Sequence, residues 1–455
     1  MMACYTQYAT ATATAAKGWT PMKTALRCAL ILCTFLTIAA CGEEPSPVVF
    51  TGLRGDVPVL DPATVEPAVI EQAAQSQRAF AVGLYHELLA TESGKNLVVS
   101  PFSIFSAFNL LYPGADAPEA ELMRQGFHLT GTDQEILDGQ GALYLSLLGR
   151  STPAARIEMA NALFVGEQFQ LRQAYLDAVT RSYDATSYVV DFVNDYENVR
   201  RDINRWVEDH TAGKITNLFP PASIHKGTDM VLVNAVYFNA KWKYEFEDGD
   251  PLTFRGKAGD KVLTPMYLRM EASPYGEGPI DGVPDSLVQV LPLPYQDDRF
   301  DMVLLLPSDF DAFTASLTAD ALDRYLELGY TPPVNAEQLA FVKVPAFQIS
   351  WDIQLHESVM PALGLGGLLC TAVPRPQFLG LFDFPTCVGG VFHKAFIDVN
   401  KQGTEAAAAT GIAMNDTGNS DTPRYIYFTA DRPFVYAIVE RATRTVLFLG
   451  HVVNL

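Results

Sequence analysis

Basic residues are scarce in this chain of 455 residues, and motifs of common enzymes are absent. It contains 32 Lys and Arg against 52 Asp and Glu, which gives a formal net charge of −20. Such a surface repels phosphate backbones, so we expect no nucleic-acid partner. The sequence also lacks the Gly-x-Ser-x-Gly nucleophile elbow, the His-Glu-x-x-His zinc motif and the phosphate-binding loop of nucleotide hydrolases. We therefore expect no catalytic residue, no metal and no cofactor.

The first 41 residues have the composition of an export signal. Residues 22–27 contain two basic residues, Lys23 and Arg27, and no acidic one, and residues 28–40 form an apolar run that is too short to span a bilayer comfortably. The run ends in Ile38-Ala39-Ala40-Cys41, which resembles the bacterial lipobox, in which the cysteine is acylated and becomes the new N-terminus. The alternative is an ordinary secretory signal that is cleaved near Ala40 and leaves Cys41 as an unmodified thiol.

This leader predicts an exported bacterial protein that is held at a membrane by the acylated Cys41. Met22 starts a complete signal by itself, which makes it an alternative start of the protein. Gly42 after the cysteine suits the outer membrane of a Gram-negative cell, although a secreted, unanchored protein is the alternative. More than one acyl chain is needed for stable anchoring.

Behind the leader we expect a flexible tether and one large domain. Residues 42–68 are rich in proline and acidic residues and show no apolar periodicity, as is typical of a tether. Residues 71–90 place apolar side chains at helical spacing. The length alone would allow one large domain or two to three ordinary ones, but no linker interrupts residues 69–455.

Helical patterns concentrate in the first half of this domain, and strand-like apolar runs follow later. This order favours an α+β domain over alternating βαβ units. The strand-like runs are residues 157–165, 230–237, 287–293, 302–306, 339–344, 391–399, 434–439 and 446–453.

Only two of the six cysteines, Cys370 and Cys387, lie in the domain. The others are Cys41 and three that leave with the leader. Outside the cytoplasm, two cysteines that close a short loop are candidates for a disulfide. Two buried free thiols are the alternative.

A stretch of small residues close to the C-terminus carries a single charge. Its sequence is Gly403-Thr404-Glu405-Ala406-Ala407-Ala408-Ala409-Thr410. With the period of two that a strand imposes, the side chains of Thr404, Ala406, Ala408 and Thr410 share one face, and Glu405 lies on the other. The first face can be buried without burying a charge. An alanine-rich helix is the alternative, since Ala has the highest helix propensity.

Further motifs occur in a fixed order along residues 71–455. They are residues 96–103, 161–165, 203–208, 233–238, 293–295, 344–347, 393–399 and 428–434. Together with the stretch of small residues, they resemble the serpin family. The resemblance implies an α+β serpin fold, in which N-terminal helices pack on three β-sheets and a reactive loop at about residues 401–424 is exposed.

The resemblance also implies roles for five residues of the core. Ser100, Ser103, Asn234 and His393 would meet in the shutter of the main sheet, and Trp242 matches the tryptophan of the family's breach. Buried hydroxyl, amide and imidazole groups must satisfy one another in such a place. Without the resemblance, a set of unrelated polar residues in the core would be favoured. A Ser/His pair would also fit a hydrolase, but no motif of that class accompanies it.

The function implied by the resemblance is suicide inhibition of serine endopeptidases, with cysteine endopeptidases as a second target class. The nucleophile of the protease attacks the scissile carbonyl of the loop and forms an acyl-enzyme. The cleaved segment, from Thr404 to about Asp416, then enters the main sheet and carries the protease with it. Deacylation fails because the active site of the protease is distorted.

The scissile bond is expected at Thr417-Gly418, by counting along the loop from Thr404. The loop is longer than in typical relatives, which would shift the bond toward Asn419-Ser420. Thr417 and its apolar neighbours indicate an elastase-like or subtilisin-like target.

Lys401-Gln402 departs from the family pattern, in which two acidic residues commonly precede the hinge glycine. We expect this to remove a salt bridge at the top of the sheet.

The main alternative function is that of a non-inhibitory serpin-fold protein that binds a ligand or partner. The small residues at 406–409 favour inhibition over ligand binding. We also expect the protein to be a monomer and not an enzyme.

Replacing the lipobox cysteine tests the anchor. We expect the mature protein to partition into detergent and Cys41→Ser to move it to the soluble fraction, because acylation requires the thiol. Phase separation followed by immunoblotting measures both. Equal partitioning of the two proteins would exclude lipidation as the anchor.

Overall fold

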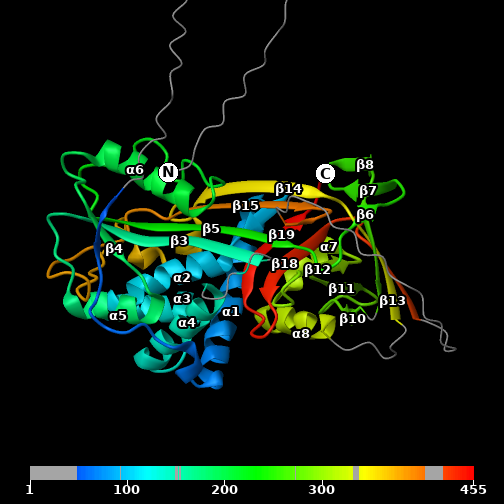
Figure 1. Ribbon diagram of the computed structural model, residues 1–455, viewed down its shortest axis with the longest axis horizontal. Helices are drawn as coiled ribbons and strands as arrows, with labels where there is room; N and C mark the ends of the chain where they lie inside the picture. The colour runs from blue at the N-terminus through cyan, green and yellow to red at the C-terminus, as the bar shows by residue number, and fades with distance from the viewer. Residues whose placement is uncertain are drawn as a thin grey trace, which may run out of the picture. The chain divides into compact units, whose positions relative to one another are not determined.

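Two long strands of 12 residues each, β3 (Ala155–Gly166) and β5 (Met230–Lys241), lie side by side in a seven-stranded main sheet in the computed structural model (Figure 1). The structure describes residues 49–455 except 93, 149–151, 153–154, 272, 331–337 and 405–423. The strands of the main sheet, in spatial order, are β1 (Thr51–Leu53), β4 (Ser187–Val190), β3 (Ala155–Gly166), β5 (Met230–Lys241), β16 (Gly403–Thr404), β15 (Phe392–Asn400) and β14 (Phe347–Gln354).

Two further sheets and a hairpin complete the strands of the described residues. The six-stranded sheet is β10 (Gly276–Pro279), β11 (Leu287–Pro294), β12 (Phe300–Pro307), β18 (Phe434–Glu440), β19 (Val446–Val452) and β2 (Leu97–Val99). The four-stranded sheet is β17 (Arg424–Thr429), β13 (Gln338–Val344), β9 (Met266–Glu271) and β6 (Glu247–Asp248), and the hairpin is β7 (Leu252–Gly256) with β8 (Gly259–Leu263). All eight strand-like runs of the sequence are strands, and the expected α+β class is confirmed.

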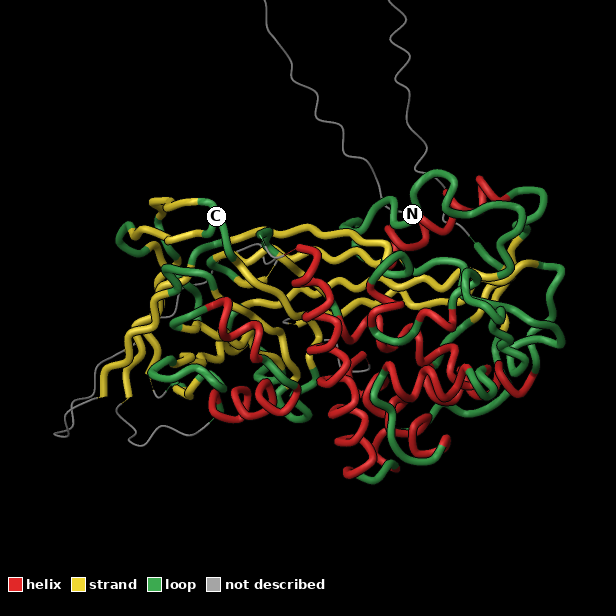
Figure 2. Tube along the Cα trace, turned by 180° about the vertical axis from the view of Figure 1, so that it is seen from behind, coloured by secondary structure: helices red, strands yellow, loops and turns green. Residues whose placement is uncertain are grey.

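Helices cover both faces of the main sheet (Figures 1 and 2). One face carries α1 (Pro67–Glu92), α2 (Pro101–Leu111), α3 (Glu119–Gly126), α4 (Asp133–Leu148) and α5 (Gln173–Tyr183). The opposite face carries α6 (Tyr196–His210), whose Ile203 and Trp206 pack in one apolar cluster with Phe164 and Val233 of the sheet. Three further helices of the described residues are α7 (Phe310–Ser316), α8 (Ala319–Gly329) and α9 (Val359–Ala362).

The segment that was expected to be a tether is partly a strand of the main sheet. β1 pairs antiparallel with β4, and the ring of Phe50 lies 4.9 Å from that of Phe164. Farther along, the Leu60 amide donates a hydrogen bond to the Arg181 carbonyl at 2.7 Å. The expectation of a tether up to residue 68 is therefore wrong for this part. β1 forms because β4 would otherwise be an edge strand with unpaired backbone groups. The ordered unit thus begins before residue 69.

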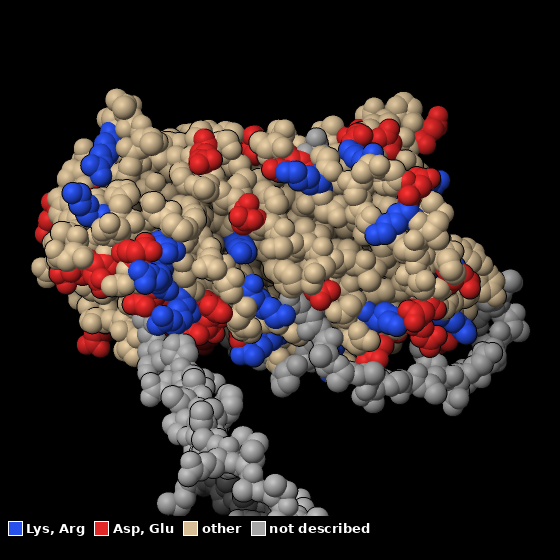
Figure 3. All heavy atoms as spheres, turned by 90° about the horizontal axis from the view of Figure 1, so that it is seen from above, with Lys and Arg blue, Asp and Glu red and all other residues tan. Residues whose placement is uncertain are grey.

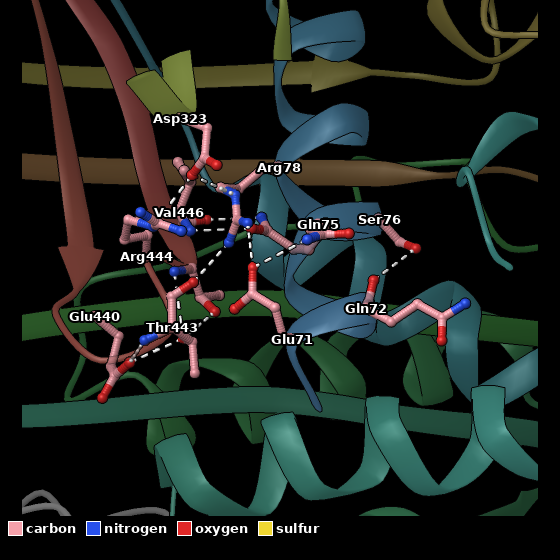
Figure 4. Close-up of polar contacts among 12 residues, drawn as sticks. Glu71, Gln72, Gln75, Ser76, Arg78, Asp323, Glu440, Thr443, Arg444 and Val446 are labelled. Atoms are coloured by element: carbon pink, nitrogen blue, oxygen red, sulfur yellow. Dashed lines mark hydrogen bonds and ion pairs between the residues drawn. The ribbon is translucent and has the colours of Figure 1, made fainter. Parts of the chain in front are cut away.

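A buried guanidinium fastens α1 to the C-terminal strands (Figure 4). The Arg78 side chain is 2% exposed, and its Nη2 lies 2.7 Å from Glu71 Oε1. Its Nε lies 3.3 Å from Asp323 of α8, and its Nη1 donates to the carbonyl of Thr443 at 2.6 Å. Removing a partner would leave the buried guanidinium less well compensated, so the network holds three distant segments in one arrangement.

The described helices do not meet the requirements of a membrane-spanning helix, and Figure 3 shows the distribution of charge on one face. None of the helices in the described part of the chain has the length and apolar content that a membrane span needs. Many of the basic side chains on the face in Figure 3 lie next to acidic ones.

Cys370 and Cys387 form a disulfide, with their Cα atoms 5.0 Å apart. We expect alkylation under nonreducing conditions to modify neither cysteine and to modify both after reduction. Intact mass before and after alkylation measures this. Two alkylated thiols in the unreduced protein would contradict the bond.

Candidate functional site

The two central strands of the main sheet, β5 and β15, run parallel but are joined by a single backbone pair. That pair is Lys394 with Ala235. Above it, β16 lies between the two strands and is antiparallel to both. Thr404 pairs with Ala240 on one side and with Val399 on the other. We call the line between β5 and β15 the seam. The start of the stretch of small residues already occupies its upper end.

A two-residue turn at Lys401 and Gln402 brings β16 back against β15. The amide of Trp242 donates to the Gln402 carbonyl at 3.0 Å, and the amide of Phe246 donates to the Lys401 carbonyl at 3.0 Å. A Cβ atom at position 403 would lie 2.2 Å from the carbonyl oxygen of Ala240. Only glycine therefore lets the chain enter the seam this close to β5.

Thr404 is buried at the entrance of the seam, where it contacts an aromatic pair. The residue is 1% exposed, and its hydroxyl lies 2.7 Å from that of Tyr295. The Tyr295 ring stacks on Trp242, with centroids 4.6 Å apart and planes 7° apart. Trp242 Nε1 in turn donates to the carbonyl of Asn400 at 2.8 Å, which joins the end of β5 to the end of β15. Burial raises the pKa of Tyr295, so its hydroxyl stays protonated.

Lys401 stands where the family pattern has an acidic residue, and it forms an ion pair of the opposite polarity. Lys401 Nζ lies 3.0 Å from the carboxylate of Asp248, on β6 of the four-stranded sheet. The basic residue thus has an acidic partner of its own. Both side chains are exposed, at 38% and 69%, so the pair contributes about 0–1 kcal/mol.

Lower in the seam, His393 of β15 connects three elements. Its Nε2 accepts a hydrogen bond from the Ser100 amide at 3.2 Å, and its Nδ1 donates to Asn234 Oδ1 of β5 at 3.0 Å. These two bonds require a neutral imidazole with its proton on Nδ1. Burial lowers the pKa of His393 to about 3, which agrees with the neutral form.

The two serines do not use their hydroxyl groups as expected. Ser100 Oγ donates to the Leu447 carbonyl at 2.7 Å and accepts from the Ser103 amide at 3.2 Å, which caps α2. Ser103 takes part through its carbonyl, which accepts a bond from Asn234 Nδ2, and its Oγ has no partner among the described residues. The serines reach His393 and Asn234 through backbone atoms because they start a helix there.

The structure thus brings the five expected core residues to two places along one seam. Three further residues of the seam had no predicted role: Tyr295 against Thr404, Asn161 against Asn234 at 3.1 Å, and Asp248 against Lys401. Of these, Tyr295 and Asn161 belonged to motifs of the sequence and carried a usable signal, whereas Asp248 did not. Cys41, Glu405 to Thr410, Thr417 and Gly418 lie outside the described residues.

Comparisons with known proteins agree with this architecture. The family model described as Serpin (serine protease inhibitor) matches residues 75–455. An uncharacterized serpin-like protein of Thermococcus kodakarensis is 32% identical over 381 residues, which cover 83% of this chain and 84% of that protein. The leukocyte elastase inhibitor of Bos taurus is 30% identical over 386 residues, 84% of this chain and 99% of that protein.

A solved structure of thyroxine-binding globulin in complex with thyroxine is also similar. It has a TM-score of 0.68 at 25% identity and covers 84% of this chain and 98% of that chain.

Neutral buried histidines predict that acid weakens the fold. Below pH 6.5 the unfolded imidazole of His393 binds a proton that the folded one rejects until about pH 3, so stability falls as pH falls. At pH 5 the loss is about 2 kcal/mol for this residue. Urea unfolding at pH 7.5 and pH 5 should therefore show a loss about 2 kcal/mol smaller in His393→Gln than in the wild type.

The exposed His225 provides the control, since its side chain lies at the surface and not in the core. His225→Gln should lose as much stability as the wild type between the two pH values. Equal losses in all three proteins would show that His393 titrates normally in the folded state.

Proposed function

Because this chain belongs to the serpin family, we propose that it is a suicide inhibitor of serine endopeptidases, with cysteine endopeptidases as a second class. A protease cleaves the reactive loop at Thr417-Gly418 and remains attached as an acyl-enzyme. The segment that begins at Thr404 then enters the seam and draws the protease along. The protein itself turns over no substrate.

The position of β16 is the observation that carries this proposal. A strand that continues downward from Thr404 would be antiparallel to both β5 and β15, as Thr404 already is. Two ladders would then replace a parallel contact of one residue pair. Roughly a dozen new hydrogen bonds at about 1 kcal/mol each would drive the insertion.

The relatives include both kinds of serpin, so membership in the family does not decide between them. The leukocyte elastase inhibitor is named as an inhibitor, whereas thyroxine-binding globulin is described in complex with thyroxine. The alanines at 406–409 favour inhibition in this chain, because small side chains can pass between two closing strands. We further propose an elastase-like or subtilisin-like target and a monomer anchored in the cell envelope through the acylated Cys41.

A protease-inhibitor complex that survives denaturing electrophoresis tests the proposal. The protein is mixed with pancreatic elastase, subtilisin or trypsin, and a band at the summed mass is expected with at least one of them. Thr404→Arg should abolish most of that band while cleavage of the loop continues. An arginine cannot enter the buried space beside Tyr295 without leaving a charge unpaired.

Glu405→Arg is the matched variant, since it adds the same side chain on the other face of the incoming strand. It should largely retain inhibition. The moles of inhibitor consumed per mole of protease inactivated compare the two variants. Values near one for both would contradict insertion that begins at Thr404, and cleavage of the wild type without any stable complex would contradict inhibition itself.

A further inference from the structure

An aromatic group is exposed on the outer face of the four-stranded sheet, next to the C-terminal end of the reactive loop. Tyr425 and Tyr427 of β17 are 52% and 68% exposed. Phe341 of the neighbouring β13 lies between them and is partly exposed. We call these three residues the aromatic face. In Figure 1 they belong to β13 and to the strand that accompanies it at the right edge of the view.

The aromatic face is held in place before any partner arrives. The ring of Tyr427 stacks on Phe341 with centroids 5.4 Å apart and planes 14° apart, and Tyr425 lies 6.0 Å from the same ring. On the inner side of β17, Ile426 and Phe428 are 4% and 0% exposed and fix the strand against the core. Ordered aromatic rings lose little conformational entropy on binding, which favours them as contact residues.

The composition of the aromatic face is that of an interface centre. Tyrosine and arginine are enriched among the residues that dominate binding energies, and Arg269 of β9 lies directly opposite Phe341 with an exposed side chain. β17 is also the edge strand of its sheet. Edge strands usually carry charges or prolines that discourage association. This one has a charge only at its first residue, Arg424, and then carries two exposed tyrosines.

We propose that the aromatic face docks the target protease during its first encounter with the reactive loop. This rests on the proposed function, because it requires that the protease cleave the loop. β17 begins at Arg424, six residues beyond Gly418. Six residues span at most about 21 Å, so a protease with the scissile bond in its active site lies beside this end of the sheet. Its surface around the active-site cleft is therefore the occupant.

The contact would act on association and not on trapping. After cleavage, the acylated protease is attached to the segment that ends at Thr417, whereas β17 belongs to the other fragment. Movement into the seam therefore separates the protease from the aromatic face. The aromatic face therefore raises the rate at which the protease associates with the loop. It does not affect the competition between insertion of the loop and deacylation of the protease.

Serine substitutions of the two tyrosines test this separation of effects. The double variant Tyr425→Ser/Tyr427→Ser should lower the second-order rate constant of inhibition about tenfold for the proteases that the wild type traps. The moles of inhibitor consumed per mole of protease should not change. Tyr196→Ser, which removes a tyrosine that is 39% exposed at the start of α6, is the control and should match the wild type in both quantities. If the double variant has a lower thermal midpoint than the wild type, Tyr427→Ser alone carries the test.

Each result decides the matter. An unchanged rate constant for every trapped protease would overturn the docking role, as would a rise in inhibitor consumption at an unchanged rate. Analytical ultracentrifugation addresses a second copy of the chain as the occupant, because a wild-type dimer that the double variant dissociates would make the aromatic face a self-contact. If the wild type traps none of the three proteases, the proposed function itself fails. In contrast, normal trapping with an unchanged rate refutes only the aromatic face.

Discussion

The sparse pairing between β5 and β15 is the constraint on which the rest of the structure depends. β3 pairs with β5 from Ala155 to Val165, and β14 pairs with β15 along its whole length, so each half of the main sheet is continuous. Between the halves a single residue pair of the described strands connects two parallel backbones. The sheet can open there at the cost of few hydrogen bonds, whereas opening at any neighbouring ladder would break many.

Side chains close the seam together with the short backbone ladders of β16 at its upper end. The bond from His393 to Asn234 crosses it below, and the bond from Trp242 to the Asn400 carbonyl crosses it above. Each of these hydrogen bonds can be replaced by another without breaking a strand. A buried donor or acceptor that is left without any partner would cost about 1–3 kcal/mol. In the proposed mechanism, the seam would therefore stay shut until an incoming strand supplied other partners. The remote network at Arg78 ties α1 to the C-terminal segments, so the surrounding scaffold keeps its arrangement.

Strands that are buried in the core can be predicted from the sequence. Strands and ion pairs that depend on a segment far away in the chain cannot. β12, β18 and β19 are buried along their length, and their continuous apolar runs made them recognisable. β14 alternates buried and exposed residues and carried a usable signal that was missed. β1 is a strand only because the edge of β4 is available, and Lys401 is paired only because the fold places Asp248 beside it. Neither partner can be read from local sequence.

The presence of Thr404 in the seam changes where the barrier to insertion lies. A strand that enters a closed sheet must first separate its future neighbours and order its leading residue before any ladder bond repays that cost, as with the first turn of a helix. Here Gly403 and Thr404 have already formed the first pairs with both sides. In the proposed mechanism, each later residue would extend an existing ladder, so insertion after cleavage would be propagation. Propagation would compete with hydrolysis of the acyl-enzyme, whereas a slow first step would release the protease intact.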